Sequence, residues 1–151
     1  MKAYDVRRWT SSERLGEIMG MIHAAFDGFE PPSGVLKETA ADLAKRQRDG
    51  FVLVAMEGDD FLGSLFCAQK DNSLYLTRMA TRPDMWGSGV GRAMLRVAED
   101  EARTMGLPRL SLRVRKTLPG NRVYFARFGF VVIGEGQEDG RTPFDVMEKV
   151  L

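Results

Sequence analysis

The chain has 151 residues, a length that suits one domain, and 44% of them are hydrophobic, which is ordinary for a globular protein. Its 22 Lys and Arg residues nearly balance its 21 Asp and Glu residues, so the net charge favours no nucleic-acid partner and any anion site must be local. We find no signal peptide, no apolar run long enough to span a membrane and a single cysteine, so we expect one cytoplasmic domain over residues 1–151 without disulfides or membrane contact.

The N-terminal third predicts a short strand and two helices. Residues 3–8 favour a strand, and a hydroxyl side chain at positions 10–12 is expected to cap a helix whose apolar residues recur at helical spacing. Those apolar residues are Leu15, Ile18, Met19, Ile22 and Phe26. Glycines and prolines within residues 28–34 end this helix, and residues 35–48 predict a second, more polar one.

The middle of the chain predicts three strands, a helix and a further strand. Apolar, β-rich runs at residues 51–56 and 61–68 predict a hairpin, and residues 74–81 predict a third strand. Residues 90–105 carry their apolar side chains on one helical face, and residues 109–115 alternate between apolar and polar as a strand does.

The C-terminal segment predicts a short helix and two closing strands. Asn121 can cap the helix, which is expected to reach Phe128, and the strands are expected at residues 130–134 and 144–150. The elements therefore follow the order strand, two helices, three strands, helix, strand, helix and two strands, which indicates a mixed α/β domain.

Between a predicted strand and a predicted helix lies a glycine-rich loop, Trp86-Gly87-Ser88-Gly89-Val90-Gly91-Arg92. The start of a helix leaves about four backbone amides unpaired and carries about half a positive charge, and glycine lets the backbone approach a phosphate closely. Arg92 in the first turn opposes the helix dipole unless an anion binds there. The loop therefore predicts a phosphate site.

Other interpretations of the loop can be compared by residue spacing. A Walker loop requires Gly-Lys-Ser/Thr, whereas Arg92 and Ala93 follow Gly91, so that interpretation fails. A dinucleotide-binding loop needs the spacing G-x-G-x-x-G and an acidic residue about twenty residues later, and this chain has Ser111 in that region. A turn that only lets a helix and a strand pack together is the structural alternative.

Two segments resemble the GNAT superfamily of acyl-CoA-dependent N-acetyltransferases, and the resemblance covers residues 74–130. In the first, the glycine-rich loop follows Met79-Ala80-Thr81-Arg82-Pro83 and is similar to the family's Arg/Gln-x-x-Gly-x-Gly/Ala signature, with Trp86 in place of Arg or Gln. The second resembles the family's aromatic helix ending in Gly-Phe and reads Tyr124-Phe125-Ala126-Arg127-Phe128-Gly129-Phe130.

The resemblance implies a GNAT-like domain of mixed α/β class, with about seven strands in a central, mostly antiparallel sheet and about four helices. It also implies that the strands at residues 74–81 and 109–115 splay apart and form a cleft for acetyl-CoA. The cofactor's pantetheine would pair with the backbone of Met79 and Thr81, and a strand amide near Met79 or Ala80 would stabilise the oxyanion. The implied cofactor-binding residues are Met79, Ala80, Thr81, Trp86, Gly87, Ser88, Gly89, Val90, Gly91, Arg92, Asn121, Tyr124 and Phe125.

The reaction that the resemblance implies needs an acid and a base. The family often uses a tyrosine to protonate the departing thiolate, and its usual place is taken here by Phe125, so the neighbouring Tyr124 becomes the catalytic candidate. Water as the acid, or a packing role for Tyr124, is the alternative. Residues 74–81 contain no carboxylate, so Asp71, Glu30 and a chain of waters stay open as the base.

The acceptor is expected to be a small-molecule amine or a peptide. In the family, the connection between the first two helices borders the acceptor pocket, which implies that Phe29, Glu30 and Ser33 bind substrate; a rigid turn is the alternative. Asp139 or Asp145, near the closing strands, could also contact a cationic acceptor.

Several other reactive side chains fit structural roles. His23 has no second metal ligand at metal-site spacing, so we expect it to pack and we expect no metal site. Cys67 lies in an apolar run and is expected to be buried. Arg113, Arg115 and Lys116 could steer the cofactor's phosphates, with solvated strand charges as the alternative.

The sequence therefore predicts an N-acetyltransferase that moves an acetyl group from acetyl-CoA to a primary amine by direct attack in a ternary complex. A non-catalytic acyl-CoA or nucleotide-binding sensor is the alternative, and a Rossmann-type oxidoreductase is a third class. Exposed edge strands also suggest a homodimer.

Overall fold

The computed structural model describes residues 4–29 and 32–151, and its elements follow the order predicted from the sequence. They are β1 (Asp5–Arg8), α1 (Leu15–Phe26), the 3-10 helix η1 (Gly34–Lys37), α2 (Ala40–Asp49), β2 (Phe51–Glu57), β3 (Asp60–Lys70), β4 (Ser73–Thr81), the 3-10 helix η2 (Pro83–Met85), α3 (Val90–Thr104), β5 (Arg109–Arg115), α4 (Pro119–Ala126), β6 (Val131–Glu138) and β7 (Thr142–Val150). None of the helices within the described ranges is long and apolar enough to cross a lipid bilayer.

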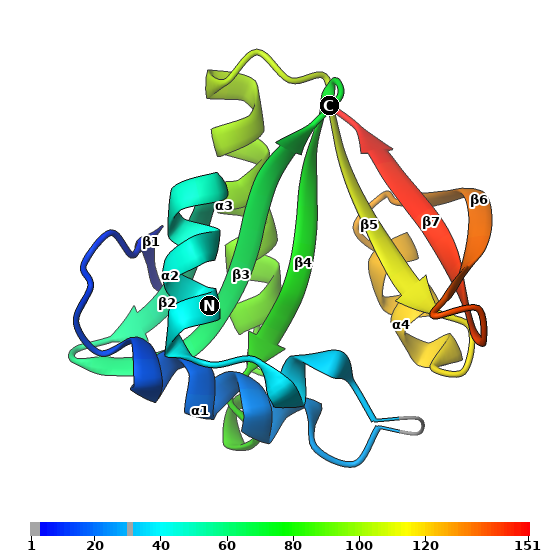
Figure 1. Cartoon of the computed structure of the whole chain (residues 1–151). Helices are drawn as coiled ribbons and strands as arrows, with labels where there is room; N and C mark the ends of the chain where they lie inside the picture. Colours follow the sequence, from blue (N-terminus) through cyan, green and yellow to red (C-terminus); the bar gives the residue numbers. More distant parts are fainter. Residues whose placement is uncertain (1–3, 30–31) are drawn as a thin grey trace.

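The seven strands form one sheet in the order β1-β2-β3-β4-β5-β7-β6, and only the β4–β5 pair is parallel. Helices α1 and α2 lie on one face of this sheet and α3 lies on the other (Figure 1). Two cores result. Ile18 and Leu43 pack with Val52 under α1 and α2, and Met94 of α3 packs with Leu53 on the opposite face. The mixed, mostly antiparallel sheet confirms the predicted fold class.

The parallel strands β4 and β5 separate part of the way along their length. They pair only from Ser73 to Leu76 and from Arg109 to Leu112. Beyond that point β4 stays with β3, whereas β5 stays paired with β7 to its end, so the sheet opens like a V (Figure 1). This confirms the predicted splay of the two strands.

A β-bulge in β4 lies beside this opening. The register of β3 and β4 shifts between Ser64 and Phe66, so that Arg78 and Met79 both oppose Leu65. Arg78 adopts a positive φ of 53°, which a non-glycine residue rarely does. Because two residues face one, the bulge leaves a backbone group outside the hydrogen-bonded ladder and increases the local twist.

Helices α1 and α2 begin later than the sequence predicts. The residue before α1 is Arg14, which has a left-handed conformation and no side-chain cap, and the hydroxyl of Ser11 instead accepts a hydrogen bond from the Glu13 amide. The predicted hydroxyl cap is therefore wrong. The predicted helix over residues 35–48 is interrupted, because Thr39 and Asp42 form a capping box that starts α2 after an extended stretch.

Helix α4 also differs from the prediction. Leu118, not Asn121, precedes the helix, and Pro119 occupies its first position, where a missing amide hydrogen costs nothing. Asn121 lies within the first turn instead. The helix ends at Ala126, before Phe128. The sequence signal for a cap at Asn121 was therefore outweighed by the fixed φ of the proline two residues earlier.

Candidate active site

The first turn of α3 presents unpaired backbone amides beside the opening between β4 and β5. Gly89 precedes the helix with a φ of 91°, and no side chain caps it. Within residues 4–29 and 32–151, the amides of residues 90–92 find no acceptor, and pairing begins where Ala93 donates to the Gly89 carbonyl at 3.0 Å. Gly87 also has a positive φ, and no heavy atom lies within 4 Å of the Cβ position at either glycine.

Backbone groups at the end of β4 alternate between β3 and the opening. The Arg82 amide donates to the Leu62 carbonyl of β3 at 2.8 Å, so the preceding residue, Thr81, turns its backbone groups the other way. In agreement, the Thr81 carbonyl accepts a hydrogen bond from the indole Nε1 of Trp86 at 2.9 Å. The side chain of Ala80 is buried in the core beneath α1.

The loop before α3 is held by few contacts. Trp86 is 64% exposed, and its indole is tied to the strand through the bond to Thr81. The Ser88 amide donates to Met85 at 3.2 Å, and the Ser88 carbonyl accepts from the Tyr4 hydroxyl at 3.0 Å. Arg92 is exposed in the first turn of the helix.

Tyr124 of α4 reaches the first turn of α3. A Cβ atom built on Gly91 would lie 2.5 Å from the Tyr124 hydroxyl and 3.5 Å from Cε of Met79, so the three residues meet. The ring is half-buried, and burial raises the pKa of the Tyr124 phenol. No hydrogen-bond partner of this hydroxyl occurs among the described residues. The group is therefore protonated at neutral pH and available to a ligand.

The other two predicted contacts of α4 differ in exposure. Phe125 is 9% exposed and packs edge-on against Tyr124 and Phe130 in the core. Its side chain is therefore placed to support Tyr124 rather than to present a surface. Asn121 is exposed, and its backbone amide donates to the Leu118 carbonyl at 2.9 Å.

The connection between α1 and α2 borders the opening from the other face. Its Pro32 carbonyl accepts a hydrogen bond from Arg115 of β5 at 3.5 Å. Phe29 packs against Phe26 at the end of α1. Ser33 is buried, and its hydroxyl accepts a hydrogen bond from the Val35 amide, so it starts η1. The predicted substrate residue Glu30 lies outside the described residues.

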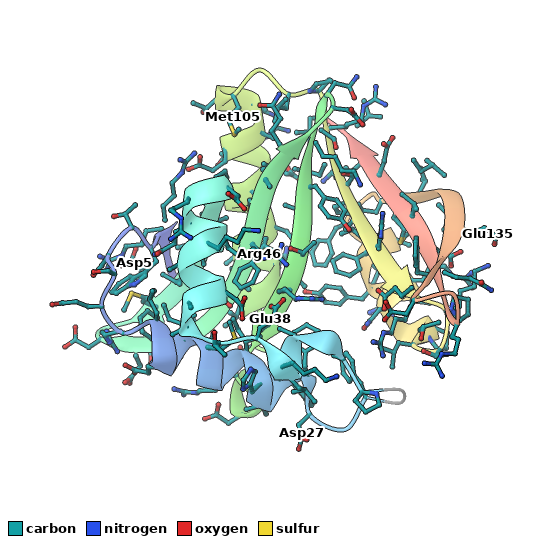
Figure 2. The ribbon with its side chains drawn as sticks, in the orientation of Figure 1. Asp5, Asp27, Glu38, Arg46, Met105 and Glu135 are labelled. Atoms are coloured by element: carbon teal, nitrogen blue, oxygen red, sulfur yellow. The ribbon has the colours of Figure 1, made fainter. Side chains whose placement is uncertain are left out.

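A network of charges that the sequence did not indicate lies on this α1–α2 face. Glu38 is placed between Arg78 of the bulge, at 3.3 Å, and Arg46 of α2, at 3.6 Å. Figure 2 labels Glu38 and Arg46 in front of the strands. Beside them, a pocket of about 340 Å³ is lined in part by Tyr75 and Thr77 of β4. Strand alternation could have placed Tyr75 and Thr77 on one face, but the bulge that turns Arg78 toward Glu38 leaves no such pattern.

The remaining candidates have structural partners. Asp145 is buried between Lys116, at 3.4 Å, and Arg122, at 3.7 Å, so its charge is already compensated. Asp139 lies in the turn between β6 and β7, and Asp71 lies in the turn between β3 and β4.

The histidine and the cysteine both have structural surroundings. His23 donates a hydrogen bond from Nε2 to the Glu38 carbonyl at 2.9 Å. Cys67 is buried, as predicted, and burial raises the pKa of its thiol. A thiol that stays protonated is a poor nucleophile, which argues against a role for Cys67 in covalent chemistry.

The predicted steering of the cofactor's phosphates by β5 is not supported. Leu112 and Val114 pack in the core under α3, so the alternating side chains of Arg113 and Arg115 lie on the opposite face of the sheet, away from the glycine-rich loop. The sequence pattern showed that these arginines share a face, but not which face.

The described residues fit the coenzyme that the resemblance implies. Three consecutive helix-start amides lack acceptors, two preceding glycines have open space where a side chain would stand, and a protonated hydroxyl lies against the same turn. Amides and positive helix ends bind phosphate groups, whereas the strand edge of β4 offers backbone groups to an extended chain. The fit therefore rests on main-chain groups more than on side chains.

Comparison with known proteins agrees with this geometry. Residues 18–130 match the acetyltransferase (GNAT) family. The fold is similar to the PaiA N-acetyltransferase from Thermoplasma acidophilum in complex with coenzyme A, with 18% identity, a TM-score of 0.82, and coverage of 99% of this chain and 100% of that chain. It is also similar to the ribosomal-protein-S18-alanine N-acetyltransferase from Escherichia coli, with 18% identity, a TM-score of 0.79, and coverage of 97% and 93%. The ribosomal-protein-alanine N-acetyltransferase from Brucella melitensis gives 21% identity, a TM-score of 0.76, and coverage of 97% and 99%.

The matched segment runs from within α1 to the residue before β6 and therefore includes β4, the glycine-rich loop, α3 and α4. The elements that form the opening in the sheet are thus the ones that the family shares. The chain belongs to the acetyltransferase (GNAT) family, whose acetyl donor is acetyl-CoA.

Proposed function

We propose that this protein transfers the acetyl group of acetyl-CoA to a primary amine of a small molecule or peptide by direct attack in a ternary complex. The observation that carries the proposal is the opening between β4 and β5, with the unpaired amides of α3 at its edge. An opening through a sheet is accessible from both faces. Acetyl-CoA and the acceptor can therefore enter from opposite sides. The acetyl group can then pass directly to the amine, and no residue of the protein needs to be acetylated first.

Main-chain groups hold the donor in this proposal. The amides of Gly87 and of residues 89–92 bind the pyrophosphate, because the positive end of α3 and its missing cap favour an anion. The backbone of Met79 and Thr81 binds the pantetheine. Since the Trp86 indole occupies the Thr81 carbonyl in this structure, we expect Trp86 to give up that hydrogen bond when coenzyme A binds.

Two groups of the chain act on the reacting atoms. Acetyl-CoA supplies a thioester whose carbonyl carbon accepts electrons from a neutral amine. The Met79 amide, at the bulge, donates a hydrogen bond to the carbonyl oxygen as negative charge develops there; such a donor contributes about 2.7–4 kcal/mol in other enzymes. The Tyr124 hydroxyl donates its proton to the leaving sulfur, and its raised pKa keeps that proton in place until it is needed.

The amine loses its proton to water in this proposal. Among the described residues around the opening, the carboxylates of Glu38 and Asp145 are each already paired with two cationic side chains. Burial raises the pKa of the Tyr75 phenol, so it too stays protonated. We therefore expect the rate to increase with pH up to the pKa of the acceptor amine.

Calorimetry and a thiol-release assay together test the proposal. We expect heat when coenzyme A is titrated into the protein, a change in tryptophan fluorescence as Trp86 leaves Thr81, and thiol release from acetyl-CoA that depends on an added amine. The assay needs correction for hydrolysis of acetyl-CoA without acceptor.

Two results would contradict it. Absence of heat would show that the amides of α3 do not bind the coenzyme. If acetyl-CoA binds but no member of a panel of polyamines, amino acids and peptides causes thiol release, the result would favour the non-catalytic sensor instead.

A further inference from the structure

Four arginines lie on the α1–α2 face of the sheet, close to the opening, and three of them have carboxylate partners. Arg46 and Arg78 share Glu38. Arg115 pairs with Glu138 of β6 at 3.6 Å. The fourth, Arg113 of β5, has no carboxylate partner among the described residues. Of these four arginines, it is therefore the one that remains able to bind an anion.

Aromatic rings fix the position of Arg113. Its guanidinium carbon lies 4.6 Å from the centroid of Phe144 on β7 and 5.9 Å from that of Tyr75 on β4. A guanidinium stacked on a ring keeps its donors directed outward in the plane, where they match the two oxygens of a carboxylate. The arrangement reduces the side-chain entropy that binding would otherwise cost.

Arg113 also lines a small pocket. The pocket measures about 200 Å³ and is bordered by Tyr75, Ser111 and Val146. Lys70 and Asp71 also line the pocket, and the Lys70 Nζ lies 4.9 Å from the centroid of the Tyr75 ring. Glu148, also in the wall, pairs with Arg109 at 3.4 Å. Such a volume admits a carboxylate group but not a folded peptide.

The pocket lies beside the paired part of β4 and β5, since Ser73, Tyr75 and Ser111 belong to that part, and Arg113 lines it on the side of the opening. The last pair of β4 and β5 joins Leu76 to Leu112, so Arg113 is the first residue of β5 beyond the point where the strands separate. Side chains are drawn in the space between β4 and β5 (Figure 2). An anionic group bound to Arg113 would leave the rest of a small acceptor inside the opening.

We propose that the acceptor is an amine that also carries a carboxylate, as an amino acid does, and that Arg113 binds this carboxylate. The inference rests on the proposed function, because it assigns the acceptor class of the same site.

Matched acceptors and variants test the assignment. L-leucine, L-leucinamide and 3-methylbutylamine share a side chain and an amine but differ in the carboxylate, and thiol release measures their use. In Arg113→Gln we expect KM for leucine to rise about tenfold or more, with kcat within about twofold and no change for the two acceptors without a carboxylate.

Arg113→Lys should restore part of the affinity. Arg48→Gln, an exposed arginine near the end of α2, is the matched control and should leave all three acceptors unchanged.

A binding measurement covers the case in which turnover is absent. Saturation-transfer NMR with the protein loaded with coenzyme A should detect bound N-acetyl-L-leucine on wild type and on Arg113→Lys but not on Arg113→Gln. The signal of N-acetyl-leucinamide should be the same on all three proteins. Equal binding of both compounds, or an unchanged signal in Arg113→Gln, would overturn the assignment.

The two proposals can fail separately. If leucine and 3-methylbutylamine are acetylated equally well, and Arg113→Gln alters neither, the protein is an acetyltransferase and the carboxylate assignment is wrong. If no amine is acetylated but N-acetyl-L-leucine depends on Arg113, the carboxylate site stands and the transfer reaction does not.

Discussion

At the scale of single residues, one hydroxyl group connects the two halves of the site. Tyr124 comes from α4, and its oxygen lies 2.5 Å from the position that a Cβ atom of Gly91 would take, at the first turn of α3. Edge-on contacts with Phe125 and Phe128 hold the ring. Because its environment disfavours the phenolate, the group is suited to donate a proton and not to accept one.

Removing this hydroxyl tests the role of Tyr124. In Tyr124→Phe we expect kcat to fall about 100-fold or more, because a positioned general acid contributes about 10²–10⁴ in rate, while the affinity for coenzyme A stays within about twofold. Since burial raises the pKa of the phenol above its ordinary value of 10.0, its deprotonation should cause no loss of wild-type rate near neutral pH. Steady-state thiol release measures kcat, and calorimetry serves as the control for binding. A variant with at least half of the wild-type kcat would show that water is the acid.

At the scale of elements, α3 and α4 meet through a residue without a side chain. Gly91 is buried in the first turn of α3, although glycine destabilises a helix by about 1 kcal/mol relative to alanine. The contact with α4 explains why glycine occurs at this position, because the Tyr124 hydroxyl and Met79 fill the space where a side chain would be. The helix gives up intrinsic stability so that α4 can approach.

Adding one methyl group should separate these elements. In Gly91→Ala we expect Tyr124 to be displaced, with a fall in kcat/KM that approaches 100-fold, because small misplacements of reacting groups have effects of this size. The melting temperature should change little, since alanine favours the helix. Gly20→Ala on α1, where no heavy atom lies within 4 Å of the added carbon, is the control and should retain full activity. Full activity of Gly91→Ala would contradict the contact.

At the scale of the whole molecule, the sheet is closed by packing on both faces and open only where β4 and β5 part. Cys67 of β3 belongs to the core under α3, and its burial raises the thiol pKa above its ordinary value of 9.0. At the other end of the sheet, β6 is an edge strand that exposes Val131, Val132 and Ile133. The homodimer expected from exposed edges stays a prediction.

The buried thiol predicts a loss of stability in alkali. As the pH rises above about 9, the thiol of the unfolded chain ionises whereas that of the folded chain does not, so the unfolded state binds fewer protons and gains stability relative to the folded state. Between pH 8 and pH 10 the free energy of unfolding should fall by about 1–2 kcal/mol from this group. Urea unfolding of wild type and Cys67→Ala measures it. If the free energy of unfolding falls equally between pH 8 and pH 10 in the two proteins, the prediction is wrong.

Much of the fold could be predicted because its signals are local. Strict alternation located β5 at residues 109–115, and apolar residues at helical spacing located α3 to within one residue at its end. Where a local signal had a competitor, the prediction was wrong: Pro119 set the start of α4 instead of Asn121, and the capping box of Thr39 and Asp42 divided the second helix.

The sequence by itself determined the order of the elements, the glycine-rich start of α3 and the family resemblance, because periodicity, glycine content and short motifs act over neighbouring residues. Only the tertiary structure decided where β4 leaves β5, that Arg78 turns toward Glu38, that Tyr124 meets Gly91, and on which face Arg113 lies unpaired. Each of these depends on contacts between segments far apart in the chain. Such contacts are set by how the two cores pack against the sheet, which no local pattern of residues records.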